Sequence, residues 1–157
     1  MHNCITIDEQ RELQNIADAQ KRIGSCITDT VQLLHKKHTA GKRILIEGAQ
    51  ATLLDIDHGT YPYVTSSSTT VAGALQGLGL APRSLGDVIG VAKAYCTRVG
   101  AGEFPTEVGG EIGDRLRERG GEYGSVTKRP RRCGWLHIPD LRRAAIINGF
   151  SCWNITK

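Results

Sequence analysis

The change in hydrophobic period near residue 42 constrains the fold more than any other feature of this sequence. Before it, apolar residues recur at the spacing of an α-helix; after it, short apolar runs of strand type alternate with helical stretches. The strand-type runs are residues 43–47, 87–95 and 151–156. Because strands separated by helices pair in parallel, the sequence predicts an α/β protein with a mostly parallel central sheet and flanking helices.

Residues 1–42 are predicted to form a helical segment, with two helices between residues 6 and 40. Thr6 and Glu9 make a capping-box pattern at the start of the first helix. Gly24 interrupts the helical pattern, and Gly41 follows its last turn. The segment therefore reads as two helices with a break near residue 24.

Residues 43–157 are predicted to form the α/β part. Helices are expected at residues 69–78, 109–119 and 139–148, the last of them starting at Pro139. Residues 51–68 and 120–134 are expected to be loops. The final run is of strand type and no helix follows it, so we expect these residues to be part of a larger domain.

Composition narrows the class of protein. The chain has 157 residues and a formal charge of +4, which suits an anionic small molecule better than nucleic acid. No apolar run reaches the roughly 18 residues of a membrane span, and the N-terminus has no apolar signal region. The five cysteines are odd in number, widely spaced and without metal-ligand spacing. They predict reduced thiols in a cytoplasmic protein. Because no apolar run is long enough to span a membrane, no membrane partner is expected.

Three polar stretches are candidates for a site, and each has two or more interpretations. The hydroxyl cluster Val64–Thr70 precedes a predicted helix, where it either caps the helix or binds an anion. The basic run Lys128–Arg132 is a solvated loop, a nucleic-acid patch or a clamp for a small anion, since arginine forks suit carboxylates and phosphates. Asp55, Asp57 and His58 form either a metal or acid–base site or a loop tied by aspartate to its own backbone.

No nucleotide-binding fingerprint is complete in this sequence. The pattern GxxxxGK[ST] is absent, and Gly77-Leu-Gly79 and Gly100-Ala-Gly102 each lack the third glycine of GxGxxG. Pattern alone therefore identifies no phosphate-binding loop.

Taken in order, the motifs resemble those of the adenylosuccinate synthetase family. The resemblance is strong over about residues 43–157, while residues 1–42 agree in position and character. The matching runs are Ile46–Gln50, Leu53–Ser67, Lys93–Tyr95, Thr97–Gly100, Phe104–Glu107, Arg129–Trp135 and Thr156–Lys157.

The resemblance implies a GTP-dependent C–N ligase of purine nucleotide biosynthesis. Such an enzyme uses GTP and Mg²⁺ to join IMP and L-aspartate: GTP phosphorylates the 6-oxygen of IMP, and the aspartate nitrogen displaces the phosphate. It further implies a cytoplasmic homodimer with a P-loop-NTPase-like α/β architecture and no nucleic-acid partner.

Several positions carry over from the family residue by residue. For IMP, Gln50 matches the glutamine that contacts the base, Thr65 a threonine that holds the phosphate, and Val99 and Arg129 residues near the ribose. The expected aspartate-binding loop and its arginine are Ser125, Val126, Thr127, Lys128, Arg129 and Arg131. Arg131 also matches a residue on the GTP side, and Lys157 matches the lysine that begins the guanine-recognition motif.

The sequence also departs from the family pattern. The loop usually reads Thr-Thr-Gly-Arg, so Val126 removes a hydroxyl and Lys128 replaces a glycine; Ser68 replaces a common asparagine. The family's phosphate loop, its aspartate base, its histidine acid and its metal ligands are not among these residues. We expect the 157 residues alone to be inactive. The alternative is a non-catalytic remnant that serves as a weak nucleotide-binding or interaction module.

Overall fold

The computed structural model describes residues 7–157. The chain forms two compact units, and the boundary between them falls between Ile44 and Leu45. Among the described residues, no helix is both long enough and apolar enough to cross a membrane.

The first unit contains the two predicted helices, α1 (Glu9–Ile23) and α2 (Thr30–Thr39), with a 3₁₀ turn at Gly24–Cys26 between them. Asp8 caps α1 by accepting a hydrogen bond from the Arg11 amide, and Asp29 caps α2 in the same way. The proposed cap residue Thr6 lies outside the described residues. The apolar side chains of this unit, such as Ile16 and Ile27, are mostly exposed, so local capping signals define these helices more than packing does.

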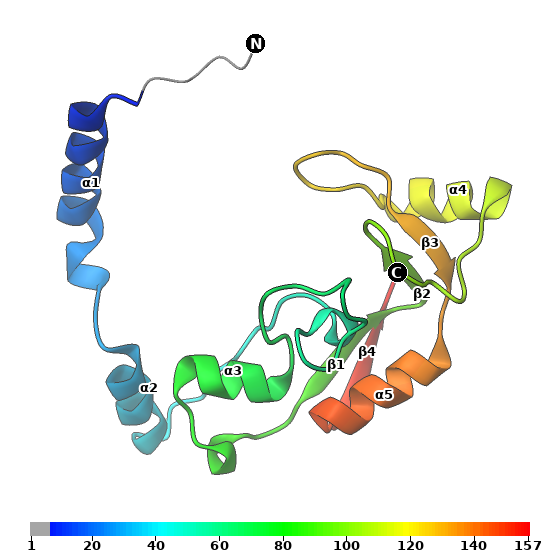
Figure 1. Cartoon of the computed structure of the whole chain (residues 1–157). Helices are drawn as coiled ribbons and strands as arrows, with labels where there is room; N and C mark the ends of the chain where they lie inside the picture. Colours follow the sequence, from blue (N-terminus) through cyan, green and yellow to red (C-terminus); the bar gives the residue numbers. More distant parts are fainter. Residues whose placement is uncertain (1–6) are drawn as a thin grey trace. The chain divides into compact units, whose positions relative to one another are not determined.

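The second unit is built around a parallel strand pair. Strand β1 (Ile89–Lys93) pairs with β4 (Cys152–Thr156), and the register runs from Ile89 opposite Cys152 to Lys93 opposite Thr156. The two strands lie side by side in Figure 1, although almost sixty residues of chain separate them. This pairing confirms the predicted parallel α/β sheet.

A second, antiparallel strand pair was not predicted. Strand β2 (Tyr95–Arg98) pairs with β3 (Arg132–Trp135). The prediction of one strand over residues 87–95 is therefore wrong. The strand ends before a bend at Ala94, and the residues after the bend pair with a different strand. The prediction of a loop over residues 120–134 is also wrong at its end, where β3 begins. Neither change has a local signal, since a strand is defined by its neighbour.

The predicted strand at residues 43–47 is wrong as well. Residues 42–49 have no regular secondary structure, and Leu45 is almost fully exposed. A strand needs a partner to satisfy its backbone groups, and no other segment within residues 7–157 pairs with this one. The expected burial of β1 is also incomplete: Ile89 and Val91 are 57% and 68% exposed, and only Gly90 is buried, beneath Trp153.

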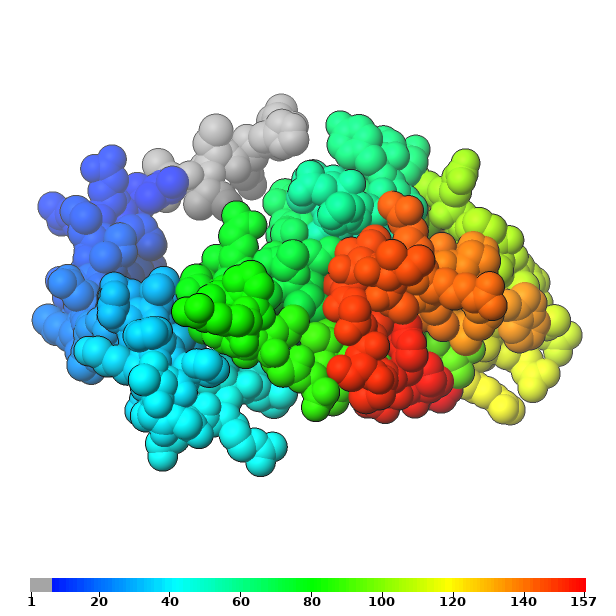
Figure 2. Space-filling model, turned by 90° about the horizontal axis from the view of Figure 1, so that it is seen from below, coloured from blue at the N-terminus to red at the C-terminus, as the bar shows by residue number. Residues whose placement is uncertain are grey.

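The three predicted helices of this unit are confirmed, with shifted ends. They are α3 (Val71–Leu78), α4 (Gly110–Gly120) and α5 (Ile138–Asn148), and short 3₁₀ turns lie at Thr52–Leu54 and Pro82–Ser84. Helix α5 begins one residue before Pro139, which suits the first turn because proline has no amide hydrogen to leave unbonded. Figure 2 shows α5 and the segment after it, coloured orange to red, on the surface of this unit.

Candidate functional site

Asp55 is the structural centre of the loop that carries several predicted site residues. Its carboxylate is fully buried. One oxygen accepts hydrogen bonds from the amides of Asp57 and His58, each at 3.0 Å. The other accepts from the Thr69 amide at 2.7 Å and from the Ser68 hydroxyl at 3.1 Å. The carboxylate thus joins the two ends of a loop across more than a dozen residues.

The electrostatics of Asp55 fit a structural role. Burial by itself would raise the pKa of this carboxyl, but the backbone and hydroxyl hydrogen bonds lower the pKa to about 2. A carboxylate held ionised and fully hydrogen-bonded is a poor proton donor near neutral pH. The interpretation of Asp55 as a tie between loop and backbone is therefore confirmed. Among residues 7–157, no group of three or more His, Cys, Asp or Glu side chains is arranged to hold a metal ion.

Gln50 and Thr65, both predicted to contact IMP, lie next to each other. The Gln50 side-chain amide donates to the Thr65 hydroxyl at 3.2 Å, and Ser67 donates to the Gln50 carbonyl oxygen at 3.3 Å. Gln50 adopts a positive φ of 69°, which is uncommon for a residue with a side chain. The Gln50 side chain is exposed, so its amide and the neighbouring hydroxyls are accessible to a ligand.

The hydroxyl cluster Val64–Thr70 has two parts: one caps helix α3, and the other lies beside Gln50. Thr70 is the N-cap of α3 and accepts from the Gly73 amide at 3.3 Å, as the capping interpretation predicts. The buried Asn148 of α5 also serves this helix start, because its side-chain oxygen accepts from the Val71 amide at 2.9 Å. Thr65 and Ser67 instead face Gln50.

Arg98 at the end of β2 fixes the loop that carries Thr65. Its guanidinium donates to the Thr60 hydroxyl at 3.1 Å and to the Tyr63 carbonyl at 3.4 Å, and it lies over the Tyr63 ring. Strand β2 is therefore connected through Arg98 to the loop that carries Thr65.

A cluster of charges is centred on Glu122, which is only 1% exposed. One Glu122 oxygen accepts from Lys93 at 3.0 Å, from Lys157 at 3.1 Å and from the Tyr95 hydroxyl at 2.5 Å. The other accepts from Arg131 at 3.3 Å. Lys93 also donates to the Thr97 hydroxyl at 2.7 Å. Two of the predicted ligand residues, Arg131 and Lys157, thus share one carboxylate.

The charge state of this cluster follows from its contacts. Burial alone would raise the pKa of Glu122, but the hydrogen bonds from Tyr95 and the two lysines lower it to about 2. Burial and the same hydrogen bond raise the pKa of Tyr95 well above its usual range. Glu122 is therefore an anion and Tyr95 a neutral donor at physiological pH. No motif in the sequence marks Glu122, which follows two glycines and precedes a tyrosine.

The predicted aspartate-binding loop is an exposed hairpin. Tyr123 and Pro130 form an antiparallel bridge, and the Gly124 amide donates to the Arg129 carbonyl at 2.9 Å. The tip, residues 125–128, is exposed, and Lys128 has a φ of 54°. Lys128 therefore occupies the left-handed conformation that its glycine counterpart in the family pattern would adopt without a steric penalty.

Val99 and Arg129 make no side-chain hydrogen bond with the other predicted IMP residues among residues 7–157. Val99 is exposed just after β2. Among the described residues, no side-chain hydrogen bond or ion pair joins Arg129 to Gln50 or Thr65. The structure brings Gln50 together with Thr65, and Arg131 together with Lys157, but it does not join all four.

Arg132 holds the segment between β2 and α4. Its guanidinium makes two contacts with Glu107, at 2.8 and 2.5 Å, and donates to the carbonyls of Gly100 and Gly102. The hydrogen bond from Arg132 lowers the pKa of Glu107. This arginine of the basic run is therefore engaged within the fold.

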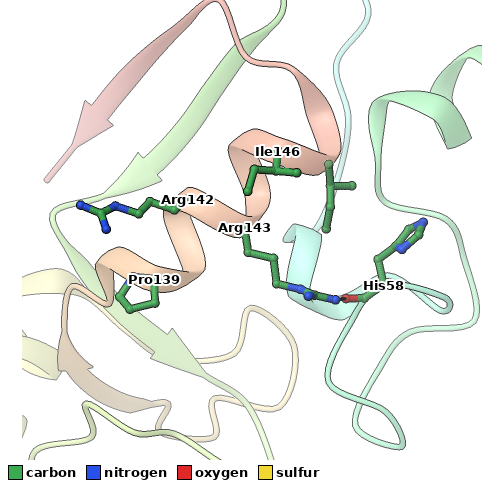
Figure 3. A pocket seen from close by; sticks show the side chains of 6 residues that line it. His58, Pro139, Arg142, Arg143 and Ile146 are labelled. Atoms are coloured by element: carbon green, nitrogen blue, oxygen red, sulfur yellow. Dashed lines mark hydrogen bonds between the residues drawn. The ribbon is translucent and has the colours of Figure 1, made fainter.

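A hollow of about 510 Å³ lies on the exposed side of α5. Figure 3 shows Arg143 reaching toward His58, whose carbonyl accepts from it at 3.1 Å. The lining residues are His58, Pro139, Arg142, Arg143, Ile146 and Ile147. Of these residues, only His58 was among the candidates from the sequence, and none was predicted to bind IMP, aspartate or GTP.

The fold and the site together define an α/β protein whose loops present an amide, hydroxyls and fixed cations around a parallel strand pair. A family model described as adenylosuccinate synthetase matches residues 1–157, the whole chain. The chain belongs to the adenylosuccinate synthetase family, as its motifs indicated.

Individual relatives agree with this assignment. An adenylosuccinate synthetase of Thermodesulfovibrio yellowstonii is 50% identical over 157 residues, which is 100% of this chain and 37% of that protein. A chloroplastic adenylosuccinate synthetase of Oryza sativa subsp. japonica is 55% identical over 148 residues, covering 94% of this chain and 30% of that one. The chain therefore spans about a third of the length of these relatives.

Solved structures show the same relation. The structure of a fully ligated adenylosuccinate synthetase from Plasmodium falciparum matches with a TM-score of 0.92 and 47% identity, covering 97% of this chain and 36% of that one. A cyanophage S-2L succinoaminodeoxyadenylate synthetase matches with a TM-score of 0.65 and 26% identity, covering 82% of this chain and 39% of that one. The α/β architecture is therefore that of the synthetase family.

Proposed function

We propose that the protein containing this chain is a GTP-dependent ligase that joins IMP and L-aspartate to give adenylosuccinate, in the synthesis of AMP. The γ-phosphoryl group of GTP is transferred to the 6-oxygen of IMP, which releases GDP. The aspartate amine then attacks carbon 6, which bears that oxygen, and displaces phosphate. Family membership supports the reaction class. The single observation that supports an IMP site among these residues is the hydrogen bond between Gln50 and Thr65.

Gln50 and Thr65 offer the two kinds of group that a purine nucleotide needs. An amide donates to and accepts from a base edge, and a hydroxyl beside a second hydroxyl, that of Ser67, suits phosphate oxygens. In the structure these groups satisfy one another. A bound nucleotide would exchange those internal hydrogen bonds for its own, at little net cost.

The residues proposed for the other substrates are basic. Arg131 and the loop Ser125–Arg129 are the proposed contacts for aspartate, and Arg131 with Lys157 for GTP. Arginine binds a carboxylate with two parallel hydrogen bonds, and lysine contributes a compact charge with three donors. Their partner in the fold, Glu122, leaves part of each side chain exposed for such a ligand.

Within residues 7–157, no group of three or more His, Cys, Asp or Glu side chains is arranged to hold a metal ion. No step is therefore assigned to the magnesium that the family resemblance implies. We propose, from the family resemblance, that the protein is a homodimer. A cytoplasmic location is proposed from the cysteines, four of which are free among the described residues: Cys26, Cys96, Cys133 and Cys152.

The test supplies IMP, GTP, aspartate and Mg²⁺ to the protein as its source makes it and follows adenylosuccinate formation. Thr65→Val keeps the shape of the side chain and removes the hydroxyl. It should raise the KM for IMP at least about tenfold while the KM for aspartate stays within about twofold. Arg131→Ala should do the reverse, because a charged contact is worth about 2–5 kcal/mol. Equal effects of both variants on both substrates would refute the site.

A non-catalytic nucleotide-binding module is the second candidate, and the observation in its favour is Lys128. A lysine at a φ of 54° stands where the family pattern has glycine, so the loop has lost its permissive residue. Binding of IMP measured by calorimetry, without any turnover, would favour this candidate. Turnover at a normal rate would exclude it.

A further inference from the structure

We infer that Glu122 is a positioning residue, which fixes Arg131 and Lys157 relative to each other and so couples the aspartate loop to the guanine-recognition end of β4. The inference rests on the proposed function, because that function gives both cations their ligands. Glu122 contacts no proposed ligand itself and acts through the two side chains that it holds.

The first support is the sharing of one carboxylate. Arg131 contacts one Glu122 oxygen at 3.3 Å, and Lys157 contacts the other at 3.1 Å. Glu122 lies 9 residues before Arg131 and 35 residues before Lys157 in the chain. Within the described residues these are the only side-chain hydrogen bonds between either cation and an acidic group. A single anion therefore sets the distance between two cations from different segments.

The backbone around Glu122 strengthens this link. The Arg131 amide donates to the Glu122 carbonyl at 2.9 Å, and the Arg117 side chain donates to the Arg131 carbonyl at 2.9 Å. Lys157 also donates to the carbonyl of Gly120, two residues before Glu122. The residues between α4 and the hairpin therefore contact both Arg131 and Lys157, through side-chain and main-chain hydrogen bonds alike.

Charge balance indicates a role beyond packing. Three cations, Lys93, Arg131 and Lys157, surround one buried anion. The cluster keeps excess positive charge, and its side chains are partly exposed: 26% for Lys93, 34% for Arg131 and 44% for Lys157. Because these cations are partly exposed, solvent screens the positive charge that Glu122 does not balance. The excess charge suits anionic ligands arriving from solvent.

Free donor capacity points the same way. Lysine has three donors and arginine has five, and Glu122 engages only some of them. The Nε–H of Arg131 is buried and no described atom accepts from it. Glu122 therefore orients both cations and leaves donors for ligands. Its neighbour Tyr95, which is neutral, donates to the same carboxylate without adding charge.

The test compares Glu122→Gln with Tyr95→Phe in the protein as its source makes it. Glu122→Gln keeps the shape and removes the charge, and it should raise the KM for both aspartate and GTP at least about tenfold. The KM for IMP should change less than about twofold, because no side-chain hydrogen bond or ion pair within residues 7–157 joins Gln50 or Thr65 to this cluster. Tyr95→Phe removes one hydrogen bond and keeps every ion pair, so both values should stay within about threefold. Glu122→Asp, which keeps the charge, covers the case in which Glu122→Gln does not fold, and should give an intermediate rise for the same two substrates.

A second measurement does not depend on activity. Glu122 accepts from Nη1 of Arg131, and the Nε–H of the same guanidinium is buried without an acceptor among the described residues. In NMR spectra, this Nε–H should exchange slowly with solvent while Glu122 holds the side chain in place, and at least about tenfold faster in Glu122→Gln. Arg132, which pairs with Glu107 instead, is the matched control and should not change.

The outcomes distinguish the positioning role of Glu122 from the proposed synthetase function. Equal KM changes for all three substrates, or faster exchange of Arg132 as well, would reduce Glu122 to a general stabilising residue and overturn the inference. Unchanged Arg131 exchange would overturn it too. A wild-type protein without synthetase activity would refute the proposed function, and with it the role of Glu122 in that reaction, even where the exchange rates show that Arg131 is held.

Discussion

Replacing Asp55 by asparagine should destabilise the protein strongly, although the two side chains have almost the same shape. The wild-type carboxylate accepts four hydrogen bonds while fully buried. Asparagine has one acceptor oxygen, which can keep the bonds from the amides of Asp57 and His58. Its NH₂ group would then face the Thr69 amide, another donor, so that at least one buried bond is lost.

The magnitude follows from those contacts. A hydrogen bond to a charged group is worth about 1.5–3 kcal/mol, and leaving a buried donor unsatisfied costs about 1–3 kcal/mol. We expect Asp55→Asn to lower the free energy of unfolding by about 2–4 kcal/mol. The pKa shift gives a similar scale: a fall from 3.8 to about 2 corresponds to roughly 2–3 kcal/mol at about 1.36 kcal/mol per unit.

The pH dependence supplies an independent check. The folded-state pKa of Asp55 lies below its ordinary value, so its charge stabilises the fold fully above about pH 4 and loses this effect as the pH falls through about 2. Asp55→Asn should lack this part of the acid transition. Glu122, whose pKa is also lowered to about 2, would still contribute in both proteins. The contribution of Asp55 is therefore the difference between the free energies of unfolding of the two proteins at each pH.

The assay is urea unfolding of the protein as its source makes it, at pH 7 and across the acid range. Asp57→Asn is the matched control, because Asp57 is exposed, lies two residues away and undergoes the same chemical change. It should shift the free energy of unfolding by less than about 0.5 kcal/mol. Equal stability of the two variants would refute the view that Asp55 organises this loop.

Two further predictions follow from the loop tip and the strand pair. Lys128→Gly should relieve the left-handed conformation at φ 54°, which costs roughly 1–2 kcal/mol for a residue with a β-carbon, and should improve aspartate use; Lys128→Ala, which keeps the β-carbon, should not. A fall in activity of Lys128→Gly would show that the lysine itself is useful. A polypeptide limited to these 157 residues should bind a hydrophobic dye, melt without a sharp transition and show no synthetase activity, because Val91, Ile155 and much of α5 are exposed. A sharp two-state melt from a monodisperse monomer, or turnover of IMP, would contradict this.

The sequence by itself determined the helices and the class of fold. Thr70, from the predicted hydroxyl cluster, caps α3, and the caps Asp8 and Asp29, which were not predicted, also lie next to the helices that they cap. A helix closes its hydrogen bonds within four residues, so its signals are local and can be read in order. The alternation of strand-type runs with helices was enough to predict a parallel pair. The family motifs predicted Gln50, Thr65, Arg131 and Lys157 as binding residues.

Only the tertiary structure decided the strands' partners and the centre of the charged cluster. The break at Ala94, the antiparallel pair of β2 with β3, and the irregular course of residues 42–49 depend on which segment lies alongside. Glu122 has no motif, and its partner Lys157 lies 35 residues away. A buried charge is stable only beside opposite charges that the chain brings back to it. Which residues those are is a property of the folded backbone rather than of any short stretch of sequence.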